Sequence, residues 1–523
     1  MFAALRSDPG MDAVHDEARS YDEVPYDSNP LRPTHPDHLA TQARLWGVPA
    51  PDPERCRLLE IGCATGGNLL PMAVGLPGAH FVGVDISPRQ IAAGRRVQRD
   101  LGVTNLELVA GSITDLSFPP GSFDYVVCHG VWSWVPEVVQ QAIFATIGRV
   151  LSPHGIAYVS YNTFPGWHQR RMVREMLLHR TRGITAPAER IRAARDYVQF
   201  LTRHAVHRDS AYAHFLAEEA QLLAKAADTY VFHEHLEANN RPVWFTDFVA
   251  AASSHGLAYV GEAVAEEALD DDPAIGAQLA AFGGGSLERA QHLDCLRNRT
   301  FRRSMLCRAG VPTAPTLDPQ RLRDCWLGSA LQPQPADAEL RQPGVVTFVG
   351  PGGLRMSVDH PWLKTAFAWL GQRWPECVPF AALCTAVAER LGAPLAAEAT
   401  AELAGVLLQC HRGGVLDLRP RAGSATNTPG LRPIASPLAR WMASRGQRVS
   451  SLRHELVELR PVDLLLLPLL DGHRDHPALA AALATAATAA GVPLPAGPQA
   501  AVVESLGLLG VASLLQRPAM DRR

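Results

Sequence analysis

Short apolar runs alternate with amphipathic stretches along the first third of the chain. The apolar runs are rich in Leu, Val and Ile and end in turn-forming residues, which is typical of strands buried on both faces of a parallel sheet. They predict strands at 58–61, 80–85, 106–110, 124–128 and 155–161. Helical periodicity predicts helices at 69–74, 87–101 and 140–151. Strand–helix repeats of this length predict an α/β fold, a parallel sheet with helices on both faces.

After residue 168 the pattern becomes mostly helical. Segments rich in Ala, Leu and Arg predict long helices at 169–179, 188–204 and 211–236, then a helix at 247–254 and a short strand at 257–260. Pro-rich and Gly-rich linkers divide the remainder. We expect an N-terminal arm or lid (1–40), an α/β ligand-binding domain (41–168), a helical segment that could form a homodimer (169–225), a mixed domain (226–312), a winged-helix-like helical module (345–422) and a C-terminal helical module (436–523).

The first 40 residues form a polar, proline-rich arm. Such composition is typical of a disordered tail. However, the arm carries Tyr21, Tyr26 and the run Thr34-His35-Pro36. These residues favour an arm that folds over another part of the protein.

Composition restricts the class of protein and its partners. The 523 residues carry a net charge of −3, which argues against nucleic-acid binding over the whole surface. Nine cysteines occur without a C-x-x-C pair, so neither a disulfide framework nor a zinc knuckle is indicated. No signal peptide is visible, and the strongest apolar run, 464–470, is too short to span a bilayer. We expect a cytoplasmic protein with no nucleic-acid partner, no membrane insertion and no metal.

A glycine turn follows the first predicted strand. Gly62, Gly66 and Gly67 allow a sharp turn and a close approach to a ligand, and Asn68 is expected to cap the following helix. Helix N-terminal amides at the carboxyl end of a strand form a nucleotide-type site. The second strand ends at Asp85, and an acid in that place can accept both hydroxyls of a ribose.

An acid inside the glycine motif narrows the choice of ligand. Glu60 would repel a pyrophosphate and attract a ligand that carries a sulfonium and an ammonium, which favours S-adenosyl-L-methionine over NAD. Together these residues resemble the class I methyltransferases, with Glu60-Ile61-Gly62 as the first motif and Asp85 as the ribose acid. The resemblance covers roughly 45–165 and implies a Rossmann-like sheet. The acid that often binds adenine in this family is missing; Ser112, the Ile113 amide or, less well placed, Asp115 would serve instead.

Three other stretches resemble a narrower group. They are residues 21–26 with 34–36, residues 128–136 (Cys-His-Gly-Val-Trp-Ser-Trp-Val-Pro) and residues 160–167 (Ser-Tyr-Asn-Thr-Phe-Pro-Gly-Trp). They are similar to methyltransferases with a methyltransferase regulatory domain, including the rickettsial outer-membrane-protein lysine methyltransferases. Residues 226–312 resemble that regulatory domain. The resemblance implies a protein or peptide substrate methylated on lysine.

Aromatic and polar side chains gather where the fourth and fifth strands end, which is where a substrate lies in an open α/β sheet. They are His129, Trp132, Trp134, Tyr161, Asn162 and Trp167. Rings of this kind desolvate an amine and stabilise positive charge. His129 or a tyrosine (Tyr21, Tyr26 or Tyr161) could accept the proton of the amine. Trp132 and Trp134 could instead only cover the edge of the sheet, and His129 could be structural.

The histidines of His233-Glu234-His235 lie two apart on a predicted helix and therefore face different directions, so they do not form a metal site and are expected to pack within the regulatory domain. The predicted site therefore has two parts. The catalytic candidates are His129, Trp132, Tyr161, Asn162 and Tyr26. The candidates for cofactor binding are Glu60, Gly62, Cys63, Ala64, Gly66, Asn68, Asp85, Ile86, Ser112, Ile113, His129 and Gly130.

The predicted function is methyl transfer from S-adenosyl-L-methionine to a protein lysine amine. One alternative is an N- or O-methyltransferase acting on a small molecule or a peptide natural product. Another is a non-catalytic scaffold that binds the cofactor.

Overall fold

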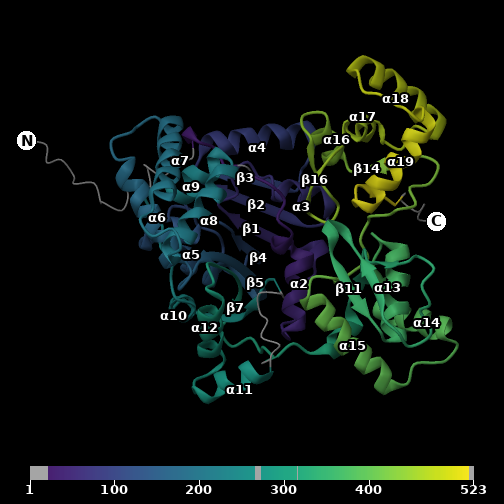
Figure 1. Ribbon diagram of the computed structural model, residues 1–523, viewed down its shortest axis with the longest axis horizontal. Helices are drawn as coiled ribbons and strands as arrows, with labels where there is room; N and C mark the ends of the chain where they lie inside the picture. Colours follow the sequence, from purple (N-terminus) through teal and green to yellow (C-terminus); the bar gives the residue numbers. More distant parts are fainter. Residues whose placement is uncertain (1–21, 27, 265–272, 315, 518–523) are drawn as a thin grey trace, which may run out of the picture.

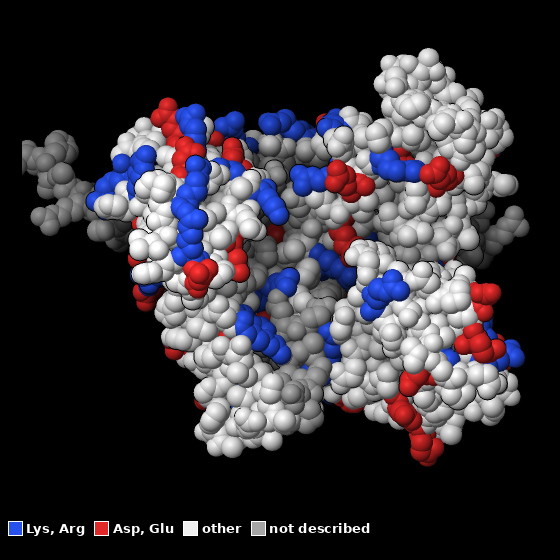
Figure 2. Space-filling view, in the orientation of Figure 1, with Lys and Arg blue, Asp and Glu red and all other residues white. Residues whose placement is uncertain are grey.

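The computed structural model describes residues 22–26, 28–264, 273–314 and 316–517 (Figure 1). Tyr21 and the start of the predicted arm lie outside the described residues. A mixed sheet lies at the centre, with the helical unit α6–α9 (residues 167–235) on one side and the C-terminal modules on the other. Figure 2 shows a hollow between the sheet domain and the C-terminal modules, with Lys and Arg side chains on its walls.

The central sheet has seven strands in the order β3-β2-β1-β4-β5-β7-β6. Strands β3, β2, β1, β4 and β5 are parallel, and β7 pairs antiparallel with both β5 and β6. Their bounds are β1 Arg57–Ile61, β2 His80–Asp85, β3 Leu106–Ala110, β4 Phe123–Cys128, β5 Leu151–Asn162, β6 Leu257–Glu262 and β7 Phe301–Arg308. The predicted α/β, Rossmann-like fold is confirmed.

Helices cover both faces of the sheet because its side chains alternate between two cores. On β1, Leu58 joins the core beneath α2, α3 and α4, whereas Leu59 and Ile61 join the core beneath α5 and α10. The helices of the two faces are α2 (Pro36–Leu45), α3 (Leu69–Gly75), α4 (Pro88–Leu101), α5 (Glu137–Val150) and α10 (Phe245–Ser253). Ser87 caps the N-terminus of α4, since its Oγ accepts a hydrogen bond from the Gln90 N–H.

The segment 226–312 does not stand apart from the sheet. Its strands β6 and β7 complete the sheet beside β5. A buried ion-pair network fastens β7, because Arg302 contacts both Glu262 of β6 and Asp294 of α12 (Ser286–Arg297). A shorter helix, α11 (Pro273–Ala281), precedes α12.

Four helices between β5 and α10 enclose a core of their own. They are α6 (Trp167–Arg180), α7 (Pro187–His204), α8 (Ala211–Lys225) and α9 (Asp228–His235). The single helix predicted at 211–236 is wrong, because Ala226 and Ala227 adopt extended backbone angles between α8 and α9. This break turns α9 toward the carboxyl ends of the strands.

Two further cores belong to the C-terminal part. The first is enclosed by α13 (Pro361–Arg373), α14 (Phe380–Leu391) and α15 (Ala397–Arg412) with the small sheet β12-β8-β13 (Val378–Pro379, Trp326–Gly328, Asp417–Arg419) and strands β9 to β11 (Gln332–Gln334, Val346–Val349, Arg355–Val358). The second contains α16 (Pro437–Ala443), α17 (Pro461–Leu466), α18 (His476–Ala490) and α19 (Pro498–Val511), the hairpin β15–β16 (Arg448–Ser450, Leu456–Glu458) and the pair β14–β17 (Ile434–Ala435, Leu515–Gln516).

Among the described residues, no helix combines the length and the apolar character needed to cross a membrane.

Candidate active site

The glycine turn after β1 has the conformation that its sequence predicts. Gly62 and Gly66 have φ angles of +79° and +73°, in the left-handed region that favours glycine. A Cβ atom on Gly62 would also lie 2.2 Å from a methyl group of Val131. The turn therefore brings the backbone to the carboxyl edge of the sheet without side chains in the way.

Asp85 is held at the end of β2 by the turn itself. Its Oδ2 accepts a hydrogen bond from the Ala64 N–H (2.7 Å), and its Oδ1 accepts one from the Ser87 N–H (2.9 Å). Burial raises the pKa of this carboxyl, and the two backbone donors oppose that rise. Each oxygen keeps a second lone pair, so the carboxylate is oriented to accept two neighbouring hydroxyls.

Glu60 lines the site and has one carboxylate oxygen without a hydrogen-bond partner among the described residues. It is buried at the end of β1, and its Oε1 accepts a 2.7 Å hydrogen bond from Asn68 Nδ2. Its Oε2 is buried and has no hydrogen-bond partner among the described residues. Burial raises the pKa of Glu60 to about 7, although the Asn68 amide favours the ionised form. An unpartnered buried carboxylate oxygen fits a cationic ligand group, such as an ammonium.

Asn68 does not cap its helix, contrary to the sequence prediction. Its side chain turns away from the helix to contact Glu60 and the N-terminal arm. Asn68 Oδ1 accepts from the Leu31 N–H (2.9 Å), and Nδ2 donates to Thr34 Oγ1 (2.9 Å). The residue thus ties the arm to the glycine turn.

The described part of the arm packs against the site; its role as a lid stays a prediction. Ser28 Oγ accepts a hydrogen bond from the Gly67 N–H (2.8 Å). Further along the arm, the Val24 carbonyl contacts His233 Nε2 (2.7 Å), and the Tyr26 ring lies edge-on to the His233 ring. The arm therefore spans the distance from the glycine turn to α9.

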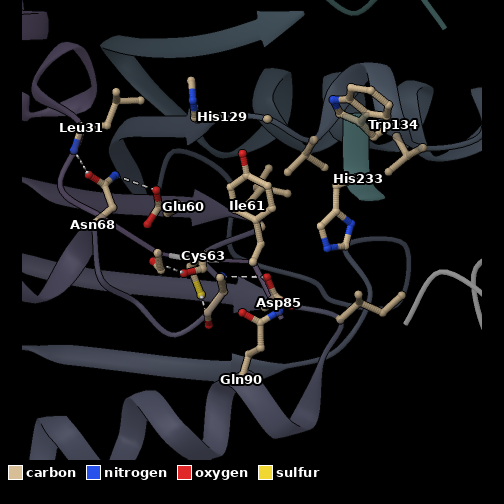
Figure 3. Close-up of a pocket in the computed structure, with 18 of the residues that line it drawn as sticks. Leu31, Glu60, Ile61, Cys63, Asn68, Asp85, Gln90, His129, Trp134 and His233 are labelled. Atoms are coloured by element: carbon tan, nitrogen blue, oxygen red, sulfur yellow. Dashed lines mark hydrogen bonds between the residues drawn. The ribbon is translucent and has the colours of Figure 1, made fainter. Parts of the chain in front are cut away.

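A cavity of about 420 Å³ lies between these elements (Figure 3). Glu60, Asn68 and Asp85 lie along the strand ends, and His129, Trp134 and His233 lie across the cavity from Asp85. Nearly all predicted residues line this one cavity. They are Tyr26, Glu60, Gly62, Cys63, Ala64, Asn68, Asp85, Ile86, Ser112, Ile113, His129, Gly130 and Asn162. Gly66 shapes the turn without lining the cavity, and Asp115 is exposed outside it.

Two predicted polar residues meet the cavity from β4 and β5. His129 Nδ1 pairs with the Tyr158 hydroxyl (2.9 Å), and burial lowers the pKa of His129 to about 4. The ring is therefore neutral at physiological pH and is a weak proton acceptor. Asn162 is 4% exposed, and its Nδ2 has no hydrogen-bond partner among the described residues. Its amide is thus available to a bound molecule.

Trp132 and Tyr161 do not line the cavity, in contrast to the substrate wall predicted for them. Both are buried in the core beneath α5 and α10. The Tyr161 ring stacks on Phe248 of α10, with centroids 3.7 Å apart, and its hydroxyl pairs with Ser304 of β7. The sequence could not anticipate these partners, which lie far along the chain. The aromatic wall consists instead of Trp134 and Trp167, whose rings meet edge-on.

Sequence reasoning placed Trp167 of α6 near the site but did not predict four further lining residues on α6 and α9. Arg170 of α6 and Tyr230, His233 and Glu234 of α9 all line the cavity. Burial raises the pKa of Glu234 to about 7, and Arg170 nearby opposes that rise. The run His233-Glu234-His235 was the available signal, but it was interpreted as packing only.

These histidines do not share a metal site. His233 contacts Glu237 and Val24, whereas neither ring nitrogen of buried His235 has a hydrogen-bond partner among the described residues. Within the described part of the chain, no group of three or more His, Cys, Asp or Glu residues is placed to bind a metal ion.

Three family models match the chain. A model described as a methyltransferase domain matches residues 58–155, and one described as a predicted methyltransferase regulatory domain matches 227–308. A third, described as the C-terminal winged helix domain of PKMT, matches 432–504. The winged-helix-like module that we expected at 345–422 lies before that match and stays a prediction.

Two similar proteins come from Rickettsia prowazekii, and both are described as uncharacterized. RP789 is 43% identical over 289 residues, which are 55% of this chain and 52% of that protein, so the chain spans about half the length of this relative. RP028 is 39% identical over 233 residues, which are 45% of this chain and 93% of that protein.

A solved structure is similar over nearly the whole chain. PKMT2 from Rickettsia typhi, in complex with AdoHcy, has a TM-score of 0.84 and 26% sequence identity, and the match covers 94% of this chain and all of that one. The sheet, the glycine turn with Glu60 and Asp85, and the regulatory segment that completes the sheet agree with these matches. The chain therefore belongs to the family of class I methyltransferases with a methyltransferase regulatory domain that includes these rickettsial relatives.

Proposed function

We propose that the protein transfers a methyl group from S-adenosyl-L-methionine to the side-chain amine of a lysine in a protein substrate. The main observation in favour of this cofactor is a pair of acids at the ends of neighbouring strands, Glu60 and Asp85. Glu60 Oε2, buried and without a partner, would bind the ammonium of the cofactor. Asp85, oriented by two backbone amides, would accept the ribose hydroxyls.

When bound, the cofactor supplies an electrophilic methyl group on a sulfonium. The chain has to bring an uncharged amine in line with that methyl group and keep water out. Trp134 and Trp167 would line the path of the lysine stem, and the amide of Asn162 would orient the reacting groups. The arm residues Ser28, Asn29 and Leu31 would close the cavity over the cofactor.

A lysine enters as an ammonium and must lose one proton before its nitrogen can react. Of the predicted acceptors, Tyr161 lies in the core and His129 is a weak base, whereas Tyr26 lines the cavity. Glu234 is better matched, because its pKa of about 7 lies near physiological pH. We assign to its carboxylate the uptake of that proton, directly or through a water molecule.

Three observations support a protein substrate over the alternatives. The solved structure with a TM-score of 0.84 is named PKMT2. The winged-helix model that matches residues 432–504 also carries the name PKMT. In addition, the hollow beside the sheet domain is wide and bordered by positive charges, which suits an acidic stretch of polypeptide (Figure 2). A cytoplasmic location and a homodimer remain parts of this proposal.

The experiment is incubation with S-adenosyl-L-methionine labelled on its methyl group and a cell extract as the source of acceptors. We expect label in the protein fraction. Label only in small molecules or free peptides would favour the first alternative. Cofactor binding with no transfer to any fraction would favour the scaffold.

A further inference from the structure

A loop of the C-terminal module reaches the cofactor site. The hairpin β15–β16 turns at residues 451–455, and His454 at its tip is 3% exposed, with φ +62°. His454 Nε2 lies 2.7 Å from Asn68 Oδ1, although the two residues are 386 positions apart. The same asparagine holds Glu60 on its other side.

The direction of these hydrogen bonds is fixed. Asn68 Oδ1 also faces the Leu31 N–H at 2.9 Å, which can only donate, so this end of the amide is the oxygen. His454 Nε2 therefore carries a proton and donates it. Burial lowers the pKa of His454 well below its ordinary value, so the ring is neutral and this is its one N–H. As a result, Asn68 Nδ2 points at the Glu60 carboxylate. The reversed amide would place an oxygen there and repel it.

Ion pairs hold the tip of the hairpin in place. Arg453 contacts Asp417 beside β8, and Arg32 of the arm contacts both Asp417 and Glu455. The Leu452 N–H also donates to the Ser513 carbonyl (2.9 Å). The hairpin is thus fastened to the arm and to both C-terminal cores, and His454 is presented to Asn68 from a rigid support.

We propose that His454 is a positioning residue for the cofactor: by donating to Asn68, it fixes the amide that holds Glu60, and so makes the C-terminal module part of the site that binds the cofactor's ammonium. This inference rests on the proposed function, because it requires a cofactor with an ammonium at Glu60. It predicts that a change in the C-terminal module alters recognition of the amino-acid end of the cofactor and leaves recognition of its nucleoside end unchanged.

The test compares two ligands by calorimetry on the full-length protein. S-adenosyl-L-methionine carries the ammonium, and 5′-methylthioadenosine carries the same nucleoside without it. We expect His454→Leu to raise the Kd of S-adenosyl-L-methionine about tenfold and to leave the Kd of 5′-methylthioadenosine unchanged. His454→Gln, which keeps a donor, should recover most of the affinity. Glu458→Gln, an exposed change on the same hairpin, is the matched control and should change neither value.

Equal weakening of both ligands by His454→Leu would mean a merely structural role and would overturn the inference, as would no change in either Kd. If His454→Leu does not fold, Asn68→Ala must show the same selective loss. Wild-type protein that binds neither ligand overturns the proposed function itself. The two failures are therefore distinguishable.

Discussion

Asn68 Nδ2 donates a 2.7 Å hydrogen bond to Glu60 Oε1, while Glu60 Oε2 has no partner within the described part of the chain. One oxygen of the carboxylate is thus fixed, and the other is buried without a hydrogen-bond partner. Burying an ionised carboxylate in this state costs free energy unless a cation pairs with it. Under the proposed function, the site would distinguish a ligand with an ammonium from a plain nucleoside through this carboxylate.

Glu60→Gln should weaken binding of S-adenosyl-L-methionine by about ten- to a hundredfold, because the amide loses the charge that pairs with the ammonium. Binding of 5′-methylthioadenosine should stay the same, which provides the control within one variant. Calorimetry measures both affinities. Parallel losses for the two ligands would contradict the role assigned to Glu60.

The affinity should also depend on pH. Because the pKa of Glu60 is about 7 in the folded protein, lowering the pH below 7 protonates the group that pairs with the ammonium. The Kd of S-adenosyl-L-methionine should rise about tenfold per pH unit in this range. In Glu60→Gln the slope should vanish. A wild-type Kd that is constant from pH 5 to 8 would refute this assignment.

The same group affects stability in the opposite direction. Its pKa is raised from 4.5, so its protonated form is favoured in the folded state. Its contribution to the free energy of unfolding of the ligand-free protein is present below pH 4.5 and is lost as the pH rises through about 7. Denaturant titrations at several pH values measure the free energy of unfolding. This free energy should fall with rising pH in the wild type by more than it does in Glu60→Gln.

Asp85→Ala should weaken cofactor binding severely, because it removes the proposed acceptor of both ribose hydroxyls and releases the Ala64 and Ser87 amides. Asp115→Ala is the matched control, since Asp115 is exposed outside the cavity. Unchanged binding by Asp85→Ala in calorimetry would exclude the ribose contact.

Trp132 and Tyr161 should affect stability rather than chemistry. Trp132→Ala removes a large buried ring and should lower the free energy of unfolding by about 3–5 kcal/mol. Tyr161→Phe keeps the stacking on Phe248 and loses only the hydrogen bond to Ser304, which costs about 1 kcal/mol. Turnover of Tyr161→Phe should match that of the wild type. A large loss of turnover would show that Tyr161 takes part in the reaction.

Glu234→Gln should lower kcat by about a hundredfold or more without changing the Kd of the cofactor. The amide cannot take the proton of the lysine ammonium but keeps the shape of the side chain. In the wild type, turnover should rise with pH through about 7 as Glu234 ionises, and the variant should lose this limb. Tyr26→Phe is the comparison variant, because Tyr26 lines the same cavity; its turnover should keep the pH dependence that Glu234→Gln loses.

The sequence predicted the parts of the site that local patterns determine. Strands β1 to β5 repeat buried apolar runs, and the glycine turn requires φ angles that glycine favours at Gly62 and Gly66. Glu60 and Asp85 follow because their places relative to the turn are fixed by the strand–helix register. These predictions needed no knowledge of distant contacts.

What the sequence did not predict depends on contacts between distant segments. Strand β7 has two adjacent arginines, Arg302 and Arg303, near its start and lacks the long apolar run of the other buried strands, so its membership in the sheet depends on pairing with β5. The break between α8 and α9 falls at two alanines, with no glycine or proline to mark it. Likewise, the contact from His454 to Asn68 exists only once the C-terminal module is in place.

The central claim is methyl transfer to a lysine, and peptide mass spectrometry of the acceptor tests it most directly. The acceptor protein labelled by the wild-type enzyme is digested, and the position of the added methyl group is determined from fragment masses, with Glu234→Gln run in parallel. We predict methyl groups on lysine side chains, at much lower yield with the variant. Methyl groups confined to other residue types, or equal yields from both enzymes, would contradict the account.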